Sequence, residues 1–237
     1  MLWRKYVAVW RPRPAFKSEW KGKMVSRSVI FWDVDTQADF MLPGGNLYVP
    51  GAERLIPNLN RLTSAAREDR VLIVGDVCVH APDDPEFRQF HPHCVIGTPG
   101  AEIIPETRAD RVLFIPNRSG AIIPRDLSIY QQLILEKQTL DVFDNPNTEI
   151  VLERMARFID RDAEIFIYGV VTEYCVRLAA KGLLERGRRV ALVRDAIETL
   201  KLEEGAKTIE ELKSLGSRLV TTDQALAALD KSESQSA

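Results

Sequence analysis

The sequence predicts an α/β protein, a three-layer αβα sandwich built on a mainly parallel sheet. Short apolar runs alternate with amphipathic stretches from residue 28 onward, and short loops join most of them. Of the 237 residues 45% are hydrophobic, which is enough for one substantial core. Strands that alternate with helices imply parallel pairing, with helices covering both faces of the sheet. We therefore expect one folded domain over residues 28–228.

Each expected element has its own apolar pattern. The expected strands are short, largely apolar runs at 28–35, 71–78, 132–138, 164–171, 188–195 and 217–222. The expected helices have apolar residues three to four positions apart, at 51–69, 147–160, 172–187 and 203–215. Gly187 is a typical C-terminal stop for the third of these helices. The run at 111–116 is a candidate for one more strand.

Residues 79–131 interrupt this alternation of expected strands and helices. They form a long stretch that is rich in proline and holds all three histidines. Loops of this length in a compact domain are usually functional or disordered. The aromatic and apolar content of the stretch favours an ordered, functional loop.

The charge is distributed unevenly along the chain. Residues 1–27 carry eight Lys and Arg against one acidic residue, Glu19, and we expect a basic, disordered tail there and a second disordered tail at 229–237. The remaining residues carry 24 basic and 33 acidic side chains, a net charge of −9, which speaks against nucleic-acid binding. No apolar run approaches the roughly 18 residues of a membrane span. Three cysteines, an odd number, argue against a disulfide framework and favour a reducing, cytoplasmic location.

Polar residues follow three of the expected strands. Ligands of parallel sheets bind beyond the carboxyl ends of the strands, where Asp35, Lys137 and Cys175 are expected to meet. A helix N-terminus and a nearby lysine favour a thiolate, which is the reactive form of cysteine. Asp35 can accept the thiol proton and return it to a leaving amine. Asp33 competes for this role but lies further back in its strand.

Each of these residues also has a simpler interpretation. Cys175 could be a small packed residue, Lys137 a solvated lysine at a strand end, and Asp35 the cap of a turn. The meeting of an acid, a base and a thiol at one sheet edge is what raises the catalytic interpretation above these alternatives.

Four motifs occur in an order that resembles the isochorismatase-like cysteine hydrolases: "VDTQADF", "HCVIGTPGAE", "LEKQTLDVF" and "GVVTEYCVRLAA". The resemblance runs from about residue 28 to 225, and "HCVIGTPGAE" is most similar to the nicotinamidase branch. It implies a six-stranded parallel sheet and a triad of Cys175, Asp35 and Lys137. It also implies a cis peptide between Val170 and Val171, with the backbone N–H groups of Val171 and Cys175 as oxyanion donors.

The nicotinamidase branch also binds a divalent metal through an Asp-x-His pair and a later histidine. His80 and His93 match the histidines, but Cys78 stands where the aspartate is expected, and Asp76 is the alternative ligand. Because zinc accepts sulfur and imidazole ligands, Cys78, His80 and His93 predict zinc, with manganese or iron as alternatives. The simpler interpretation is that the metal site has decayed. Cys94 is expected to be structural.

The resemblance points to two aromatic residues for the substrate. Phe40 and Phe90 could enclose a flat ring by offset stacking, although two phenylalanines near a cleft are also ordinary core. His91 stands where the pattern has a proline, and we assign it no role.

The implied activity is amide hydrolysis, most specifically of nicotinamide to nicotinate and ammonia in NAD salvage, through a thioester on Cys175. The same triad could instead act on a ureido or N-carbamoyl compound or on isochorismate. A hypothesis from a different class is a non-catalytic binding module that uses the basic tail. Since these hydrolases commonly self-associate, a homo-oligomer is expected.

Overall fold

The computed structural model describes residues 27–236, so the expected basic tail lies outside the described residues except for Arg27, which begins the first strand. The strands are β1 (Arg27–Val34), β2 (Leu72–Cys78), β3 (Val112–Ile115), β4 (Gln132–Lys137), β5 (Ile159–Gly169), β6 (Arg189–Ile197) and β7 (Arg218–Val220). The α-helices are α1 (Ala38–Met41), α2 (Ile56–Arg67), α3 (Thr148–Met155), α4 (Arg177–Glu185), α5 (Leu202–Ser214) and α6 (Thr222–Ser236).

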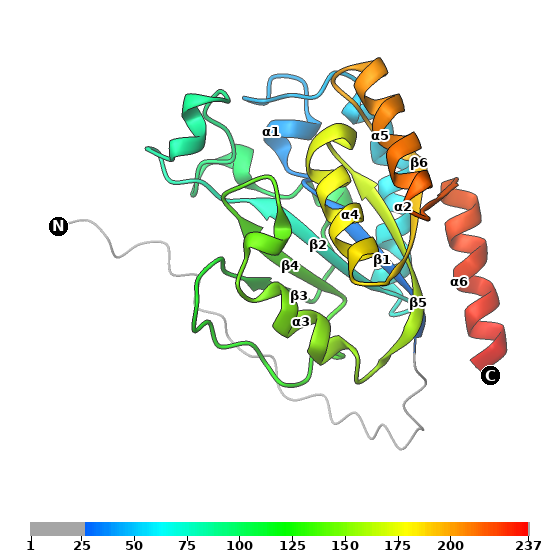
Figure 1. The fold of residues 1–237 in the computed structure, drawn as a ribbon. Coiled ribbons are helices and arrows are strands. Elements are labelled where there is room, and N and C mark those ends of the chain that lie inside the picture. Colours follow the sequence, from blue (N-terminus) through cyan, green and yellow to red (C-terminus); the bar gives the residue numbers. More distant parts are fainter. Residues whose placement is uncertain (1–26, 237) are drawn as a thin grey trace.

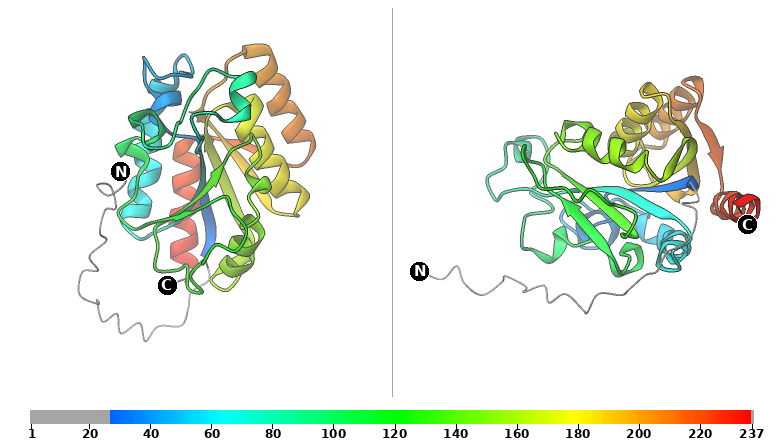
Figure 2. Two further views of the ribbon diagram at one scale, coloured as in Figure 1. Left: turned by 90° about the vertical axis from the view of Figure 1, so that its left-hand side faces the viewer. Right: turned by 90° about the horizontal axis from the view of Figure 1, so that it is seen from below.

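All the strands pair in parallel, in the order β3-β4-β2-β1-β5-β6-β7. Helices α3, α4 and α5 cover one face, and α2 and α6 lie on the other (Figures 1 and 2). The central strand β1 is buried from Val29 to its end, and β2 is buried throughout. Continuous apolar runs form such strands because both faces are covered. The predicted three-layer α/β fold is confirmed.

Within residues 27–236 the sheet has seven strands, which corrects the six that the resemblance implied. The additional strand is β3, the candidate run at 111–116, whose Leu113 lies opposite Leu133 of β4. As the edge strand it is covered incompletely, and Phe114 is 41% exposed. The strand has only four residues and lies inside the long segment 79–131, which is why the sequence left it as a candidate.

The expected third helix is divided into two parts. Residues Thr172–Val176 form a single π-helical turn, η6, and the regular helix α4 begins only at Arg177. The predicted stop is confirmed, since Gly187 adopts a left-handed φ of 68° and donates its N–H to the carbonyl of Leu184 at 2.9 Å. Residues 229–236, expected as a disordered tail, instead continue α6. The side chain of Leu229 is only 2% exposed, and its burial stabilises α6 beyond residue 228, where the domain was expected to end.

Short 3₁₀ turns order the long segment between β2 and β4: η2 (Pro85–Arg88), η3 (Pro99–Ala101) and η4 (Pro105–Thr107). The buried Gln37 attaches the segment to the sheet. Its side-chain amide donates to the carbonyls of Cys78 and Ala101, both at 2.8 Å, and accepts from the Cys78 N–H, also at 2.8 Å. The segment is therefore ordered, as predicted, and this contact lies at Cys78, the carboxyl end of β2. No helix among residues 27–236 is both long enough and apolar enough to cross a membrane.

Candidate active site

Asp35 and Lys137 form a buried ion pair at the carboxyl edge of the sheet. Asp35 directly follows β1 and adopts a positive φ of 51°, a conformation that is rare outside glycine and concentrated at functional sites. Lys137 ends β4, and its ammonium donates to Asp35 Oδ1 at 2.5 Å and to Oδ2 at 2.6 Å. Asp35 is 1% exposed and Lys137 is fully buried.

The lysine is a cation in this environment. Desolvation alone lowers the pKa of a buried lysine, but the negative charges of Asp35 and Asp76 raise the pKa of Lys137 well above its usual range. Its third N–H is directed at Cys78 Sγ, 3.3 Å away, because Cys78 and Lys137 are register partners at the ends of adjacent strands.

Cys175 lies in η6, within hydrogen-bonding reach of Asp35. Burial and the charge of Asp35 raise the pKa of the Cys175 thiol well above its usual range, and the ammonium of Lys137 only partly offsets this. The resting group is therefore a thiol, and its reactivity depends on proton transfer to Asp35. The sequence suggested instead that the helix N-terminus and Lys137 would favour a resting thiolate. The three predicted residues do lie together.

The turn before Cys175 presents a free backbone donor. The Val170–Val171 peptide is cis, as the resemblance implied. Within residues 27–236, the flanking N–H groups have acceptors, from Val170 to the Val34 carbonyl and from Thr172 to the Glu198 carbonyl, whereas the Val171 N–H has none. An unpaired N–H next to a thiol is what an oxyanion site requires.

Asp76 is the alternative metal ligand that the sequence suggested. In the structure its carboxylate contacts Trp32 and Lys137 instead of the histidines. Trp32 Nε1 donates to Asp76 Oδ2 at 3.1 Å, and Asp76 Oδ1 lies 3.1 Å from Lys137 Nζ. Burial raises the pKa of Asp76 to about 6, while the charge of Lys137 acts in the opposite direction, so the group is a carboxylate at neutral pH. Asp33 lies further back, as expected, and accepts a hydrogen bond from Thr36 at 3.0 Å.

A second polar cluster borders the Asp35–Lys137 pair. Potential ligand atoms of Cys78, His80 and His93 lie within 4.8 Å of one another, and all three residues are buried. His93 Nδ1 is 2.9 Å from the carbonyl of His91, an acceptor that fixes the proton on Nδ1 and leaves Nε2 free for a metal. Burial lowers the pKa of His93, which favours this neutral form. The cluster consists of the residues that were predicted to ligate a metal.

Two further residues of this cluster were missed. Glu86 Oε2 lies 3.4 Å from His80 Nε2, and Asp84 Oδ2 lies 3.1 Å from His80 Nδ1. Both nitrogens of the fully buried His80 and the Glu86 oxygen lack an aligned hydrogen bond. Two ligands about 2.1 Å from a tetrahedral zinc are about 3.4 Å apart, so His80 and Glu86 fit a shared cation. Asp84 is then placed to orient the ring through Nδ1.

The sequence contained only a local indication that Glu86 and Asp84 lie near His80. Both lie at the start of η2, where Asp84 Oδ1 accepts the Glu86 N–H at 2.9 Å. The Asp-Pro-Glu order after His80 is consistent with such a turn. Which carboxylates then face the histidine depends on the fold of the whole loop.

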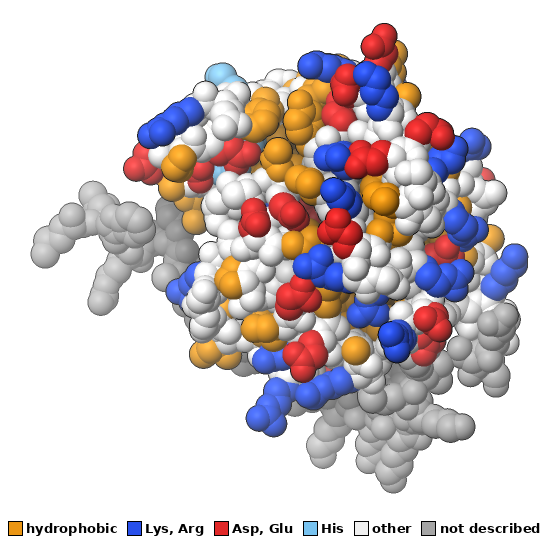
Figure 3. All heavy atoms as spheres, viewed as in Figure 1, with side chains coloured by type: hydrophobic (Ala, Val, Ile, Leu, Met, Phe, Trp, Pro, Cys, Tyr) orange, Lys and Arg blue, Asp and Glu red, His pale blue; other side chains and the backbone are white. Residues whose placement is uncertain are grey.

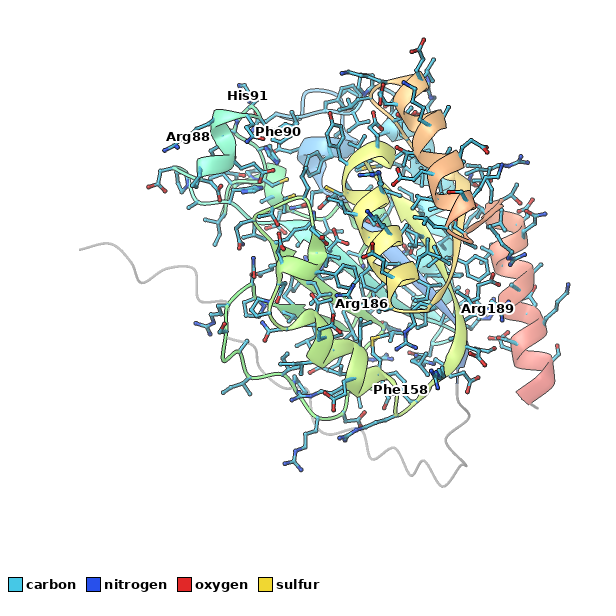
Figure 4. All side chains as sticks on the ribbon, viewed as in Figure 1. Arg88, Phe90, His91, Phe158, Arg186 and Arg189 are labelled. Carbon is cyan, nitrogen blue, oxygen red and sulfur yellow. The ribbon has the colours of Figure 1, made fainter. Side chains whose placement is uncertain are left out.

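Aromatic rings surround the outer side of the cluster. The His93 ring lies 5.2 Å from the ring of Phe40 and 6.5 Å from that of Phe90, measured between centroids. Tyr174, the residue before Cys175, lies 6.3 Å from Phe90 and was not singled out from the sequence. Phe90 and His91 project from the loop after η2 at the same end of the sheet (Figure 4), and hydrophobic side chains gather on the surface between this loop and α5 (Figure 3). The two predicted aromatic residues, Phe40 and Phe90, therefore lie at the candidate active site, where both rings are next to the ring of His93.

Comparison with known proteins gives consistent matches over most of the chain. A family model described as "Isochorismatase domain" matches residues 30–127 and 107–224. The nicotinamidase/pyrazinamidase of Mycobacterium tuberculosis (strain ATCC 25618 / H37Rv) is 26% identical over 196 residues, which cover 79% of this chain and 95% of that protein.

Solved structures give the same result. The pyrazinamidase of Pyrococcus horikoshii in complex with zinc superposes with a TM-score of 0.64 at 30% identity, covering 82% of this chain and 99% of that one. The N-carbamoylsarcosine amidase of Thermoplasma acidophilum shares the fold, with a TM-score of 0.62 at 24% identity, covering 83% and 97% of the respective chains.

Proposed function

Because the chain belongs to the isochorismatase family, as an amidohydrolase of the nicotinamidase-like branch, we propose that it hydrolyses nicotinamide to nicotinate and ammonia through a thioester on Cys175. The observation that carries the proposal is the buried meeting of Asp35, Lys137 and Cys175 at one sheet edge. The alternative of a non-catalytic binding module is set aside, because the similar proteins are hydrolases.

The first half of the reaction forms the thioester. Asp35 takes the proton of the Cys175 thiol, and the thiolate attacks the amide carbonyl carbon. The free N–H of Val171, together with the N–H of Cys175, stabilises the negative oxygen of the tetrahedral intermediate. Asp35 then returns the proton to the amide nitrogen, the C–N bond breaks, and ammonia leaves.

The second half of the reaction releases the acid. A water molecule gives a proton to Asp35 and attacks the thioester carbonyl, and the same backbone donors hold the second oxyanion. The C–S bond breaks, and the Cys175 sulfur recovers its proton from Asp35. Lys137 remains a cation throughout and keeps the carboxylate of Asp35 directed at the sulfur.

We further propose that Cys78, His80 and His93 hold a divalent metal, with Glu86, 3.4 Å from His80, as a further ligand, and with zinc preferred because thiolate and imidazole are zinc ligands. The buried Nε2 of His80 and the buried Glu86 oxygen, which make no hydrogen bond, support this assignment, as does the zinc complex of the Pyrococcus horikoshii relative. A metal bound there would supply a Lewis acid beside the reacting thiol.

The proposal is tested by assaying ammonia and nicotinate after incubation of the purified protein with nicotinamide, with Cys175→Ala as the matched control. Parallel assays with N-carbamoyl amides, ureido compounds and isochorismate test the alternatives that the same triad allows. Turnover of nicotinamide that disappears in the control supports the proposal. Turnover of another substrate, with nicotinamide untouched, replaces nicotinamide but keeps the Cys175 thioester.

A further inference from the structure

The turn η6, which carries the nucleophile, is too short to hold its own position. It has only five residues, and two of its backbone hydrogen bonds, from the N–H groups of Tyr174 and Val176, share the carbonyl of Val171 as acceptor. A single helical turn fixes several residues for few hydrogen bonds, so it is not stable alone. The position of Cys175 therefore depends on the groups to which η6 is attached.

Thr172 makes the first attachment. Its N–H donates to the carbonyl of Glu198 at 2.8 Å, and its hydroxyl donates to the same carbonyl at 2.7 Å. Glu198 directly follows β6 and begins the loop of residues 198–201 that leads into α5. Because the N–H groups of Val170 and Thr172 are both bound, the free N–H of Val171 lies between two fixed residues.

The side chain of Glu173 makes the second attachment, to the same loop. Glu173 Oε1 accepts the N–H groups of Leu200 and Lys201, at 3.0 and 2.9 Å. Glu173 Oε2 accepts the hydroxyl of Thr199 at 2.6 Å. One half-buried side chain therefore accepts three hydrogen bonds from the loop, and no step of the proposed reaction uses it.

The simpler role for Glu173 is to stabilise α5 alone, since a carboxylate near a helix N-terminus binds its free N–H groups. That role does not require the carboxylate to come from η6. Glu173 lies between Thr172 and Cys175 in the chain, so each hydrogen bond that it accepts from the loop also holds the turn. The attachment therefore acts on both elements.

We propose that Glu173 is a positioning residue, whose hydrogen bonds to residues 199–201 hold η6 where Cys175 reaches Asp35 and where the Val171 N–H reaches the substrate oxygen. A displacement of about 1 Å at a catalytic group can cost about 100-fold in rate. The effect depends on hydrogen bonds rather than on charge, so an uncharged side chain of the same shape should replace Glu173. This inference rests on the proposed function of the triad.

The first test compares two substitutions of Glu173. Glu173→Ala removes all three hydrogen bonds, and we expect kcat for nicotinamide to fall about 10- to 100-fold with KM nearly unchanged, because Glu173 acts through the turn. Glu173→Gln should keep kcat within about twofold of wild type. Its amide oxygen accepts the two backbone N–H groups, and its NH₂ donates to Thr199, whose hydroxyl then donates to the Lys201 carbonyl, 3.1 Å away.

Two outcomes of this comparison overturn the inference. One is a Glu173→Ala protein with the wild-type kcat. The other is a Glu173→Gln protein as slow as Glu173→Ala, which would assign the effect to the charge of Glu173.

Glu211→Ala is the matched control for the stability of α5. Glu211 lies on the same helix and accepts two hydrogen bonds from Arg177 of the neighbouring α4, at 2.7 Å each (Figure 1). Its removal weakens the attachment of α5 to α4 but leaves the hydrogen bonds of Glu173 in place, so kcat should stay close to wild type. A loss of kcat equal to that of Glu173→Ala would assign the effect to α5 alone and overturn the inference.

The second test is amide hydrogen exchange of the full-length protein measured by NMR, which requires no substrate. The Thr172 N–H is the reporter, because it donates to Glu198 and not to Glu173. We expect it to exchange at least about tenfold faster in Glu173→Ala and at the wild-type rate in Glu173→Gln and Glu211→Ala. Unchanged exchange in Glu173→Ala overturns the inference. A wild-type protein that hydrolyses no amide refutes the proposed function, and the exchange rates then decide whether Glu173 holds the turn.

Discussion

The triad of Asp35, Lys137 and Cys175 is in contact with the cluster around His80 through Cys78. The two regions differ in how many of their buried polar atoms have a hydrogen-bond partner within the protein. Each N–H of Lys137 has an acceptor within the protein. In contrast, His80 Nε2 and one oxygen of Glu86 are buried without a hydrogen bond, 3.4 Å from each other. Unsatisfied buried polar atoms are costly. The difference supports the proposal that the cluster around His80 holds a cation, whereas the ammonium of Lys137 is bound by protein groups.

The largest expected effect removes the nucleophile. Cys175→Ala should lower kcat for nicotinamide by about 10⁴-fold or more, because no other group can form the thioester. Cys94→Ala, the matched control, should retain most of the activity, since Cys94 is buried against the Gly100 carbonyl and no reaction step uses it. Comparable losses in the two variants would mean that neither thiol is the nucleophile.

The next effect tests whether the second cluster is a metal site. His80→Ala should weaken zinc binding at least about 100-fold, measured by metal analysis and competition with a chelating dye. His91→Ala is the matched control, because this exposed histidine contributes its backbone carbonyl to His93 and keeps it when the side chain is removed. Equal metal content in both variants contradicts the assignment, and so does a wild-type protein that binds no metal.

Removal of the metal should have a moderate effect on stability. A ligand at about 100 times its Kd stabilises a fold by about 2.7 kcal/mol, so a chelator should lower the melting temperature by about 5–10 °C. Calorimetry with and without chelator measures this shift. The His80→Ala protein should show no such shift, and an equal shift there would attribute the effect to metal bound elsewhere.

The smallest effect concerns the aromatic residues around His93. Phe90→Ala should raise KM for nicotinamide by about tenfold with little change in kcat, the loss expected for one aromatic contact. Phe114→Ala on the exposed edge of β3 is the matched control. A change in kcat alone would argue that Phe90 supports the cluster rather than the substrate.

The sequence was most informative where function depends on chain order. Residues that follow the strands of a parallel sheet lie at the same edge of that sheet. The sequence alone therefore predicted that Asp35, Lys137 and Cys175 lie close together. The edge strand β3 and the end of α6 were underestimated, because a short, half-exposed strand and a weakly amphipathic helix have little periodicity to detect.

The sequence alone could not predict which side chains contact one another. Asp76 was considered as a metal ligand because it precedes Cys78 by two residues, but Lys137 and Trp32 take its carboxylate. Glu86 was missed because its approach to His80 depends on the path of the loop after β2. Such contacts join different strands and loops, and no local pattern encodes them.

By itself, the sequence determined the α/β class and predicted that Asp35, Lys137 and Cys175 lie at one sheet edge, because hydrophobic periodicity and the polar residues that follow each strand can be read along the chain. Only the tertiary structure decided the protonation of Cys175, the partner of Asp76 and the composition of the cluster around His80. Those properties depend on burial and on charges a few ångströms away.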